Sequence, residues 1–365
     1  MRNLSHTLKA SLHAYRGLLI PLIVIACIFV YQKISNPSVV SIPNFNVNSK
    51  AGNDEARVFW KSEIGRVGGI SAYKEFLNHY ASSSPQTQHT AAHIFGGSLF
   101  AQEGLSGLVA CDSSYSFGCY HEFLGRAIEK NGLGGVNELN QACFDALGSQ
   151  RLSCSHGLGH GIQSYLGYTD EALIKSLATC ATLDYSDPIG GCFGGVFMEY
   201  NTRTMQSYSG MPSRGLQDGG VFHPCDIVPA ERKAACYYWQ PQWWSQIFAT
   251  RETTPEEVFG RIGKLCRGLA PYLRQNCFSG AGTVVGISTD YDAERSSALC
   301  EIASPNANEQ AYCKTSAASS FFGERSARDR APSLCEKIEG VWHEKCVEGA
   351  SGTSAPPQGM EEFNR

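Results

Sequence analysis

Histidines stand in the first half of this chain at spacings that suit metal binding. Five of the ten lie in three successive segments: His89 and His93, then His121, then His156 and His160. Residues four apart on a helix share one face, so each pair can present two imidazoles to a single ion. Their position predicts a polar functional site.

A carboxylate follows these histidines at a matching place. Glu199 lies close to the register that His160 occupies in its own segment. Three histidines and a carboxylate, with one position left for water, generate hydroxide near neutral pH in metallohydrolases. The expected cofactor is a divalent metal such as zinc, and the sequence predicts these ligands for it: His93, His121, His156, His160 and Glu199.

A plainer interpretation of the histidines stays open. A single pair of histidines four residues apart arises often by chance, and such side chains can be hydrogen-bonded packing. The chain contains no His-Glu-x-x-His, Cys-x-x-Cys-His or Gly-x-Ser-x-Gly motif, so no known catalytic signature supports an enzyme. Whether the protein catalyses a reaction is therefore undecided by sequence.

The elements that would position the histidines are marked by cysteines. Fourteen of the fifteen form seven pairs, with members 8 to 13 residues apart and with second members recurring every 33 to 44 residues. A period of this size is typical of stacked helical repeats. The pairs are Cys111 with Cys119, Cys143 with Cys154, Cys180 with Cys192, Cys225 with Cys236, Cys266 with Cys277, Cys300 with Cys313, and Cys335 with Cys346.

Each pair is predicted to be a disulfide that joins two helices. The segment before a first cysteine is helical in pattern: Thr254 and Glu257 form a capping box, and an apolar face leads to Cys266. The second cysteine opens the next helix. Zinc is the rival use of paired cysteines, but zinc pairs usually lie two to four residues apart.

In architecture, this plan resembles α-solenoids, particularly cysteine-paired Sel1-like or TPR-like arrays. The resemblance covers residues 54–350 and implies an all-α, disulfide-stapled α-solenoid of about seven to eight two-helix repeats. Segments 71–81 and 88–104 are expected to form a cysteine-free first pair that caps the array. Because the likeness is one of architecture, no family's functional residues are carried over.

The N-terminus predicts export. Basic residues in segment 1–16 precede an apolar stretch at 17–33, which is expected to be a signal anchor with its basic end in the cytoplasm. A lipoprotein signal ending at Cys27 and an ordinary cleaved signal remain alternatives. All three place residues 34–365 outside the cytoplasm, as seven disulfides require, most simply in a bacterial periplasm or at the cell surface.

Charge and composition bound the partners. Residues 34–365 hold 26 basic and 34 acidic side chains, a net charge of −8 with histidine neutral, which argues against nucleic-acid binding. Segment 34–53 is polar and is predicted to be a linker from the membrane. Segment 351–365 lacks an apolar period and is predicted to be a disordered tail.

Two further features bear on the site. Segment 201–224 lengthens one repeat, and it is either a lid that brings His223 over the other histidines or a surface loop. Trp239, Trp243 and Trp244 lie within six residues, which suits either a carbohydrate or peptide platform or packing between repeats.

The leading function predicted from sequence is recognition by a membrane-tethered helical repeat protein. Its ligand would be a protein, peptide or glycan bound on a histidine-rich concave face. The alternative is a metal-binding protein or metal-dependent hydrolase, and a purely structural scaffold is the third possibility. The predicted binding residues are His89, His93, His121, His156, His160, Glu199 and His223.

Overall fold

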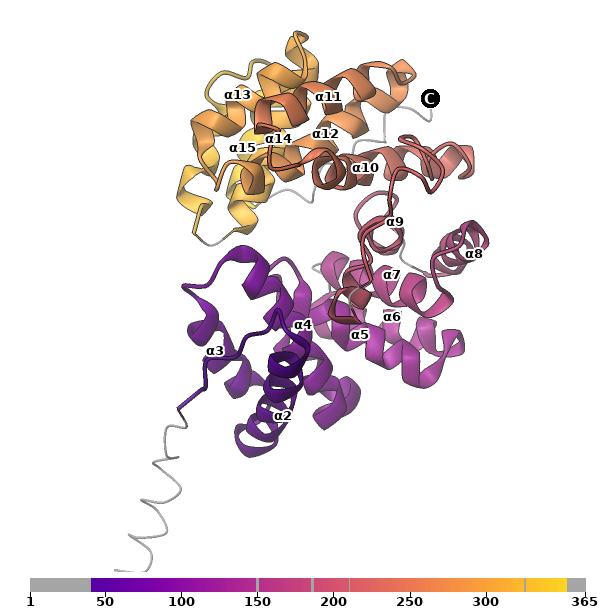
Figure 1. The fold of residues 1–365 in the computed structure, drawn as a ribbon, viewed down its shortest axis with the longest axis vertical. Coiled ribbons are helices and arrows are strands. Elements are labelled where there is room, and N and C mark those ends of the chain that lie inside the picture. Colours follow the sequence, from indigo (N-terminus) through magenta and orange to yellow (C-terminus); the bar gives the residue numbers. More distant parts are fainter. Residues whose placement is uncertain (1–40, 149–150, 185–186, 210, 325, 353–365) are drawn as a thin grey trace, which may run out of the picture. The chain divides into compact units, whose positions relative to one another are not determined.

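The computed structural model describes residues 41–148, 151–184, 187–209, 211–324 and 326–352. All regular structure within these ranges is helical, as the sequence predicts (Figure 1). Residues 45–365 form one compact unit, and residues 1–44 belong to another. The predicted anchor at 17–33 lies outside the described residues, as does most of the predicted tail. None of the helices in the described ranges is long and apolar enough to cross a membrane.

One row of helices forms a continuous series in which each helix packs on the next along the chain. These inner helices follow an arc in Figure 1. They are α2 (Lys50–Val67), α4 (Pro85–Glu103), α5 (Gly118–Asn131), α7 (Leu152–Leu166), α9 (Cys192–Thr202), α10 (Lys233–Phe248), α12 (Pro271–Ser288), α14 (Ala307–Gly323) and α15 (Val341–Ser351).

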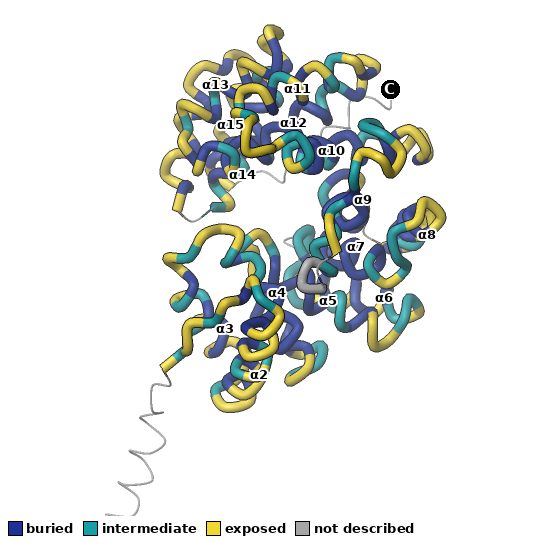
Figure 2. Tube along the Cα trace, viewed as in Figure 1, coloured by how far each residue is buried: buried dark blue, intermediate teal, exposed yellow. Residues whose placement is uncertain are grey.

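A second row covers the outside of the first. Each outer helix packs on the inner helix that follows it, and Figure 2 shows the outer row with more exposed residues than the inner row. The outer α-helices are α3 (Gly69–Tyr80), α6 (Val136–Leu147), α8 (Asp170–Ala181), α11 (Pro255–Arg267) and α13 (Ala293–Ala303). The short 3₁₀ segments are η1 (Gly104–Ala110), η2 (Leu133–Gly135), η4 (Thr204–Ser209), η5 (Ala230–Arg232) and η6 (Arg328–Cys335), of which η4 contacts the inner helices α2, α5 and α7.

Disulfides link the two rows, as predicted. All seven adjacent pairs are bonded, with Cα–Cα distances of 5.5–5.7 Å. The predicted pairing is confirmed at every position, since the bonds join Cys111 to Cys119, Cys143 to Cys154, Cys180 to Cys192, Cys225 to Cys236, Cys266 to Cys277, Cys300 to Cys313, and Cys335 to Cys346.

The bonds lie where outer elements end and inner helices begin. Most first cysteines lie at the end of an outer element and most second cysteines in the first turns of an inner helix, for example Cys180 in α8 and Cys192 in α9. In the same way, Cys313 lies in α14 and Cys346 in α15. Each bond closes a short loop, which stabilises the folded state by roughly 2–4 kcal/mol.

Helix boundaries follow local sequence. Thr254 caps α11 through the predicted capping box with Glu257. The predicted capping pair 71–81 and 88–104 is present as α3 and α4, and α2 precedes it. Ser49 caps α2, so helix begins inside the segment predicted to be a linker, and Val47 is buried against it.

Glycines allow the inner helices to touch through their backbones. A Cβ on Gly159 of α7 would lie 2.0 Å from the carbonyl oxygen of Cys192, and one on Gly195 of α9 would lie 2.0 Å from that of His156. In the same way, a Cβ on Gly96 of α4 would lie 2.1 Å from the carbonyl oxygen of Cys119 of α5. The group that approaches the bare backbone beside His160 is therefore the neighbouring helix α9.

We expect Gly159→Ala to lower the free energy of unfolding by about 1–3 kcal/mol, because α7 and α9 must separate to admit a methyl group. Gly260→Ala is the matched control. It lies inside α11 with only Ile302 within 4 Å, at 3.9 Å, so better helix propensity should raise stability by ~0.5–1 kcal/mol. Urea unfolding with the disulfides intact measures both, and equal effects of the two variants would contradict the close approach.

Candidate metal centre

The five predicted histidines meet on three consecutive inner helices. His89 and His93 come from α4, His121 from α5, and His156 and His160 from α7. Two overlapping triads hold ring nitrogens within 4.8 Å of one another, and His121 belongs to both: His89, His93, His121 and His121, His156, His160. Four of the five are buried, with His121 1 % and His160 0 % exposed.

The first triad has the shape of a three-histidine metal site. His93 Nε2 lies 3.1 Å from His89 Nε2 and 3.3 Å from His121 Nδ1. The ring planes are inclined at 71–76° to one another. A tetrahedral zinc ion with Zn–N bonds of about 2.0–2.1 Å has N···N edges of about 3.3 Å, so these separations match its coordination shell.

The second pair repeats the geometry of the first. His156 Nε2 and His160 Nε2 lie 3.2 Å apart. The ring of His121 stacks on that of His160, with centroids 4.2 Å apart and planes at 27°. A metal ion lies in the plane of each imidazole that binds it, so stacked rings cannot share one. In this arrangement the Nδ1 of His121 belongs to the first triad.

The outer nitrogens of both pairs are held by acceptors. Nδ1 of His89 lies 2.9 Å from the Tyr115 carbonyl oxygen, and Nδ1 of His156 lies 2.9 Å from that of Gly190. A carbonyl oxygen only accepts, so both Nδ1 atoms carry the proton of a neutral ring and both Nε2 atoms are bare. These loop carbonyls are partners that sequence patterns do not reveal.

The second histidine of each pair faces a buried carboxylate. His160 Nδ1 lies 2.9 Å from Glu199 Oε2, and His93 Nδ1 lies 3.8 Å from Glu122 Oε2. Ligating histidines usually donate their other ring N–H to a carbonyl or carboxylate, which fixes the tautomer. Glu199 was predicted to be a metal ligand. Its carboxylate instead contacts Nδ1 of His160, on the opposite side of that ring from the Nε2 atom.

The two carboxylates differ in their surroundings. Burial raises the pKa of Glu199 to about 7, although it accepts hydrogen bonds from Tyr168 and Thr204 at 2.6 and 2.7 Å. Burial also acts on Glu122, but contacts with His93, Arg126 and Arg57 outweigh it and hold its pKa below the usual value. Above pH 7 both carboxylates are ionised, and the bare Nε2 atoms of His156 and His160 then face each other with no proton between them.

Burial keeps four of the imidazoles neutral, those of His89, His121, His156 and His160. It lowers the pKa of His89 to about 3, aided by the charge of His93, and that of His156 to about 4. Burial, together with the neighbouring rings, holds the pKa values of His121 and His160 well below 6.5. Neutral imidazole is the form that binds metal, so the cluster is ready to coordinate at physiological pH.

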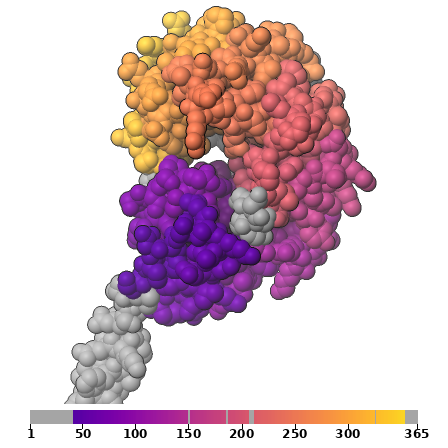
Figure 3. Space-filling view, in the orientation of Figure 1, coloured from indigo at the N-terminus to yellow at the C-terminus, as the bar shows by residue number. Residues whose placement is uncertain are grey.

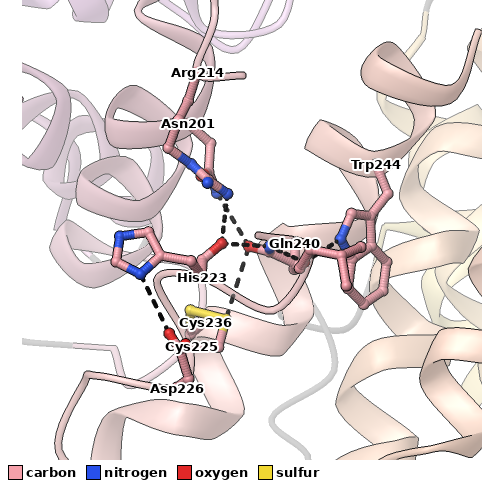
Figure 4. The surroundings of a disulfide bond; sticks show 9 residues. Asn201, Arg214, His223, Cys225, Asp226, Cys236, Gln240 and Trp244 are labelled. Atoms are coloured by element: carbon pink, nitrogen blue, oxygen red, sulfur yellow. Dashed lines mark hydrogen bonds and ion pairs between the residues drawn. A yellow bond between two sulfur atoms is a disulfide. The ribbon is translucent and has the colours of Figure 1, made fainter. Parts of the chain in front are cut away.

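His223 takes no part in the cluster. Its Nε2 lies 2.9 Å from Asp170 Oδ1, and its Nδ1 lies 3.3 Å from Asp226 Oδ1. Figure 4 shows His223 with Asn201, Arg214, Gln240 and Trp244 beside the Cys225–Cys236 disulfide. Segment 201–224 does not carry His223 over the other histidines, which was one of its two predicted alternatives. Hydrogen bonds to Asn201 of α9 and Gln240 of α10 hold the loop away from them.

Buried hydrogen bonds hold that loop. Arg214, 1 % exposed, donates from Nε to Asn201 Oδ1 at 2.9 Å, and its guanidinium also binds the His223 carbonyl. Trp243 and Trp244 donate to the carbonyls of Arg214 and Val221, both at 2.7 Å. The loop's first residues nevertheless reach the metal centre, because Thr204 and Met205 bind Glu199.

Two of the three tryptophans predicted as a platform or as packing are packed in the core, and the third contacts a histidine. Trp243 and Trp244 are fully buried within α10, which continues through Pro241. Trp239 lies beside the histidine cluster, with its ring 4.9 Å from that of His156, and its Nε1–H donates a hydrogen bond to the Ile189 carbonyl at 2.7 Å. It therefore helps to fix His156.

Comparison with family models, curated proteins and solved structures finds no match to this chain. The geometry of the histidine cluster is therefore the basis for a proposed function.

The metal-free protein should lose stability in acid. Four histidines have lowered pKa values in the folded chain, so between pH 6.5 and about 4 they bind protons in the unfolded chain but not in the folded one. The free energy of unfolding therefore decreases as the pH falls through this range. Each histidine contributes up to about 1.4 kcal/mol per pH unit. Glu199 acts in the opposite sense between pH 4.5 and 7, but it is one group against four.

His156→Gln tests this, because glutamine keeps a donor for the Gly190 carbonyl and does not titrate in this range. Urea unfolding in the presence of a chelator, repeated from pH 4.5 to 7.5, should show a smaller pH slope for the variant than for the parent. An unchanged slope would mean that His156 is not buried in neutral form.

Proposed function

We propose that this chain is an extracytoplasmic metal-binding protein whose histidine cluster holds a zinc-class divalent transition metal. The observation that carries the proposal is the orientation of the paired histidines. In both pairs the Nε2 atoms face each other at 3.1–3.2 Å, while the outer Nδ1 atoms face carbonyl or carboxylate oxygens. Where neither Nε2 of a pair carries a proton, the two lone pairs repel one another unless a cation lies between them.

The first triad is the primary site. His89 and His93 contribute Nε2 and His121 contributes Nδ1, which leaves one tetrahedral position for water or a ligand. His156 and His160 form a second, weaker pair, since the stacked ring of His121 offers them no third nitrogen. Imidazole favours zinc, copper and nickel over magnesium or calcium, which prefer oxygen.

The seven disulfides indicate an oxidising environment outside the cytoplasm. We infer from the same plan that the array is an α-solenoid of seven to eight two-helix repeats, tethered through segment 17–33. A metal-dependent hydrolase at this centre would use the fourth coordination position for water. Recognition by the concave face would use the same position for a ligand.

Metal content tests the primary site. The full chain, produced in an oxidising compartment and dialysed against zinc, should retain one tightly bound equivalent by elemental analysis. His89→Ala/His93→Ala should lose it because two of three ligands are gone. His156→Ala/His160→Ala should keep it, and should lose only weaker binding seen at higher zinc concentration. His79→Gln, outside the cluster, is the control. Full stability without any retained zinc would contradict the proposal.

Glu199→Gln tests the role assigned to the carboxylate. If Glu199 orients His160 and raises its basicity, the amide should weaken zinc binding at the second pair by 10- to 100-fold and leave the primary equivalent in place. Asp170→Asn is the matched control, since Asp170 contacts His223 instead. Titration with a chromogenic zinc competitor measures both affinities, and loss of the primary equivalent would show that Glu199 acts on the first triad.

A further inference from the structure

The inner helices enclose a cavity of about 300 Å³ beside the histidine cluster. Inner-row helices α5, α7, α9, α10, α12 and α14 all contribute side chains to it. His121 and His156 line it, and so do Val284 and Ile287 from α12. Figure 3 shows the surface hollowed between the first helices, in indigo, and the orange helices. A cavity of this volume lies at the small end of ligand sites, so it suits a small molecule.

Most of the cavity lining is apolar. Val284 and Ile287 supply aliphatic surface, and the phenylalanine, tyrosine and tryptophan side chains among the described lining residues are Phe117, Tyr238, Trp239 and Tyr291. Aromatic rings bury apolar groups well, and their faces also attract cations. The lining therefore suits an apolar body and accepts a positive charge.

Two of these aromatic residues are held in left-handed backbone. Phe117 has a φ of 63° and Tyr291 a φ of 55°, and the preceding residues, Ser116 and Asp290, share this conformation at 54° and 52°. The left-handed region is unfavourable for bulky side chains, and residues held there cluster at functional sites. The backbone at the cavity therefore supports a binding role for it.

The charged side chains of the lining are both acidic. Asp187 and Glu324 contribute carboxylates, and neither lysine nor arginine occurs among the described lining residues. Within the described ranges, neither carboxylate forms an ion pair. Their charges are therefore left for a ligand to balance.

Asp187 is the carboxylate best placed to hold such a ligand. The residue is 9 % exposed, and its Oδ1 accepts hydrogen bonds from the backbone N–H groups of Ile189 and Gly190 at 2.9 and 2.6 Å. These bonds fix the side chain through one oxygen only. The other oxygen, Oδ2, keeps accessible surface and makes no hydrogen bond with the described residues. Aspartate is almost never buried this far unless it is paired, so Oδ2 marks the position of a missing donor.

Both carboxylates act on phenols in the same lining. Burial raises the pKa of Tyr238, and the negative charge of Asp187 raises it further. Burial, followed by the charge of Glu324, raises the pKa of Tyr291 to about 12. The negative charge therefore reaches two parts of the cavity wall, and a cation inside the cavity would be attracted by both carboxylates.

We propose that the cavity binds a small organic cation, a primary amine with an apolar body. Its ammonium group donates to Asp187 Oδ2, and its body packs against Trp239, Val284 and Ile287. This site does not depend on the proposed metal site, because neither its carboxylates nor its apolar wall belongs to the histidine cluster. It gives the inner face a second kind of ligand beside a metal ion.

Benzylamine, benzyl alcohol and benzoate share a ring and differ in charge, so they are the probes. Calorimetric titration of the full chain at neutral pH, after treatment with a chelator, should show benzylamine binding about tenfold or more tightly than benzyl alcohol, as a hydrogen bond between charged groups provides. Benzoate should bind most weakly, because the carboxylates repel it. Equal affinity for the amine and the alcohol, or no binding of the amine, would overturn the inference.

Asp187→Asn tests the carboxylate itself. Asparagine keeps an oxygen for the N–H groups of Ile189 and Gly190 and removes the charge, so the affinity for benzylamine should fall about tenfold and that for benzyl alcohol should not change. Asp184→Asn is the matched control, because Asp184 is exposed in the same loop and lies outside the cavity lining. It should bind benzylamine as the parent does. An equal loss in both variants would overturn the role of Asp187, and the zinc content of the parent would still decide the metal proposal separately.

Discussion

Direct backbone contact between successive inner helices is the constraint on which the site depends. Gly159 and Gly195 bring α7 and α9 together, and Gly96 does the same for α4 and α5. At this separation His93 of α4 lies within hydrogen-bonding distance of His121 of α5, and the rings of His121 and His160 of α7 stack, which the larger spacing of ordinary helix packing would not allow. The disulfides reinforce the arrangement because each fixes the start of an inner helix to an outer element.

The contact also places the carboxylate that orients the second pair. Glu199 lies one turn beyond Gly195 on α9, so the glycine contact sets its height against His160. Tyr168, Thr204 and the Met205 N–H then hold Glu199 from the far side. The same loop therefore has two roles: its first residues support the histidine cluster through Glu199, and its later residues, Arg214 to His223, brace α10.

Much of this could be predicted from sequence, because repeat spacing is a local property. The cysteine interval predicted the disulfides, and the histidines of three successive segments predicted one shared site. The partners at Tyr115 and Gly190 could not be predicted, because they are backbone carbonyls. The cavity wall from Val284 and Ile287 could not be predicted either, because it depends on how far the array curves over many repeats. Sequence left open whether the segment with His223 is a lid or a surface loop, because a loop's anchor points depend on tertiary contacts such as those of Arg214.

The composition of the cluster itself argues that it is functional. Burying a polar ring costs free energy unless each of its nitrogens is satisfied, and a core chosen for stability alone would use leucine or phenylalanine at these positions. Four neutral imidazoles with strongly lowered pKa values, two buried carboxylates and an unpartnered nitrogen at His121 together oppose stability. The seven disulfides supply stability from elsewhere in the fold, which allows the inner face to keep such an arrangement. Departures of this kind from stable packing are expected at functional sites, and imidazole and carboxylate are groups that metal ions use as ligands.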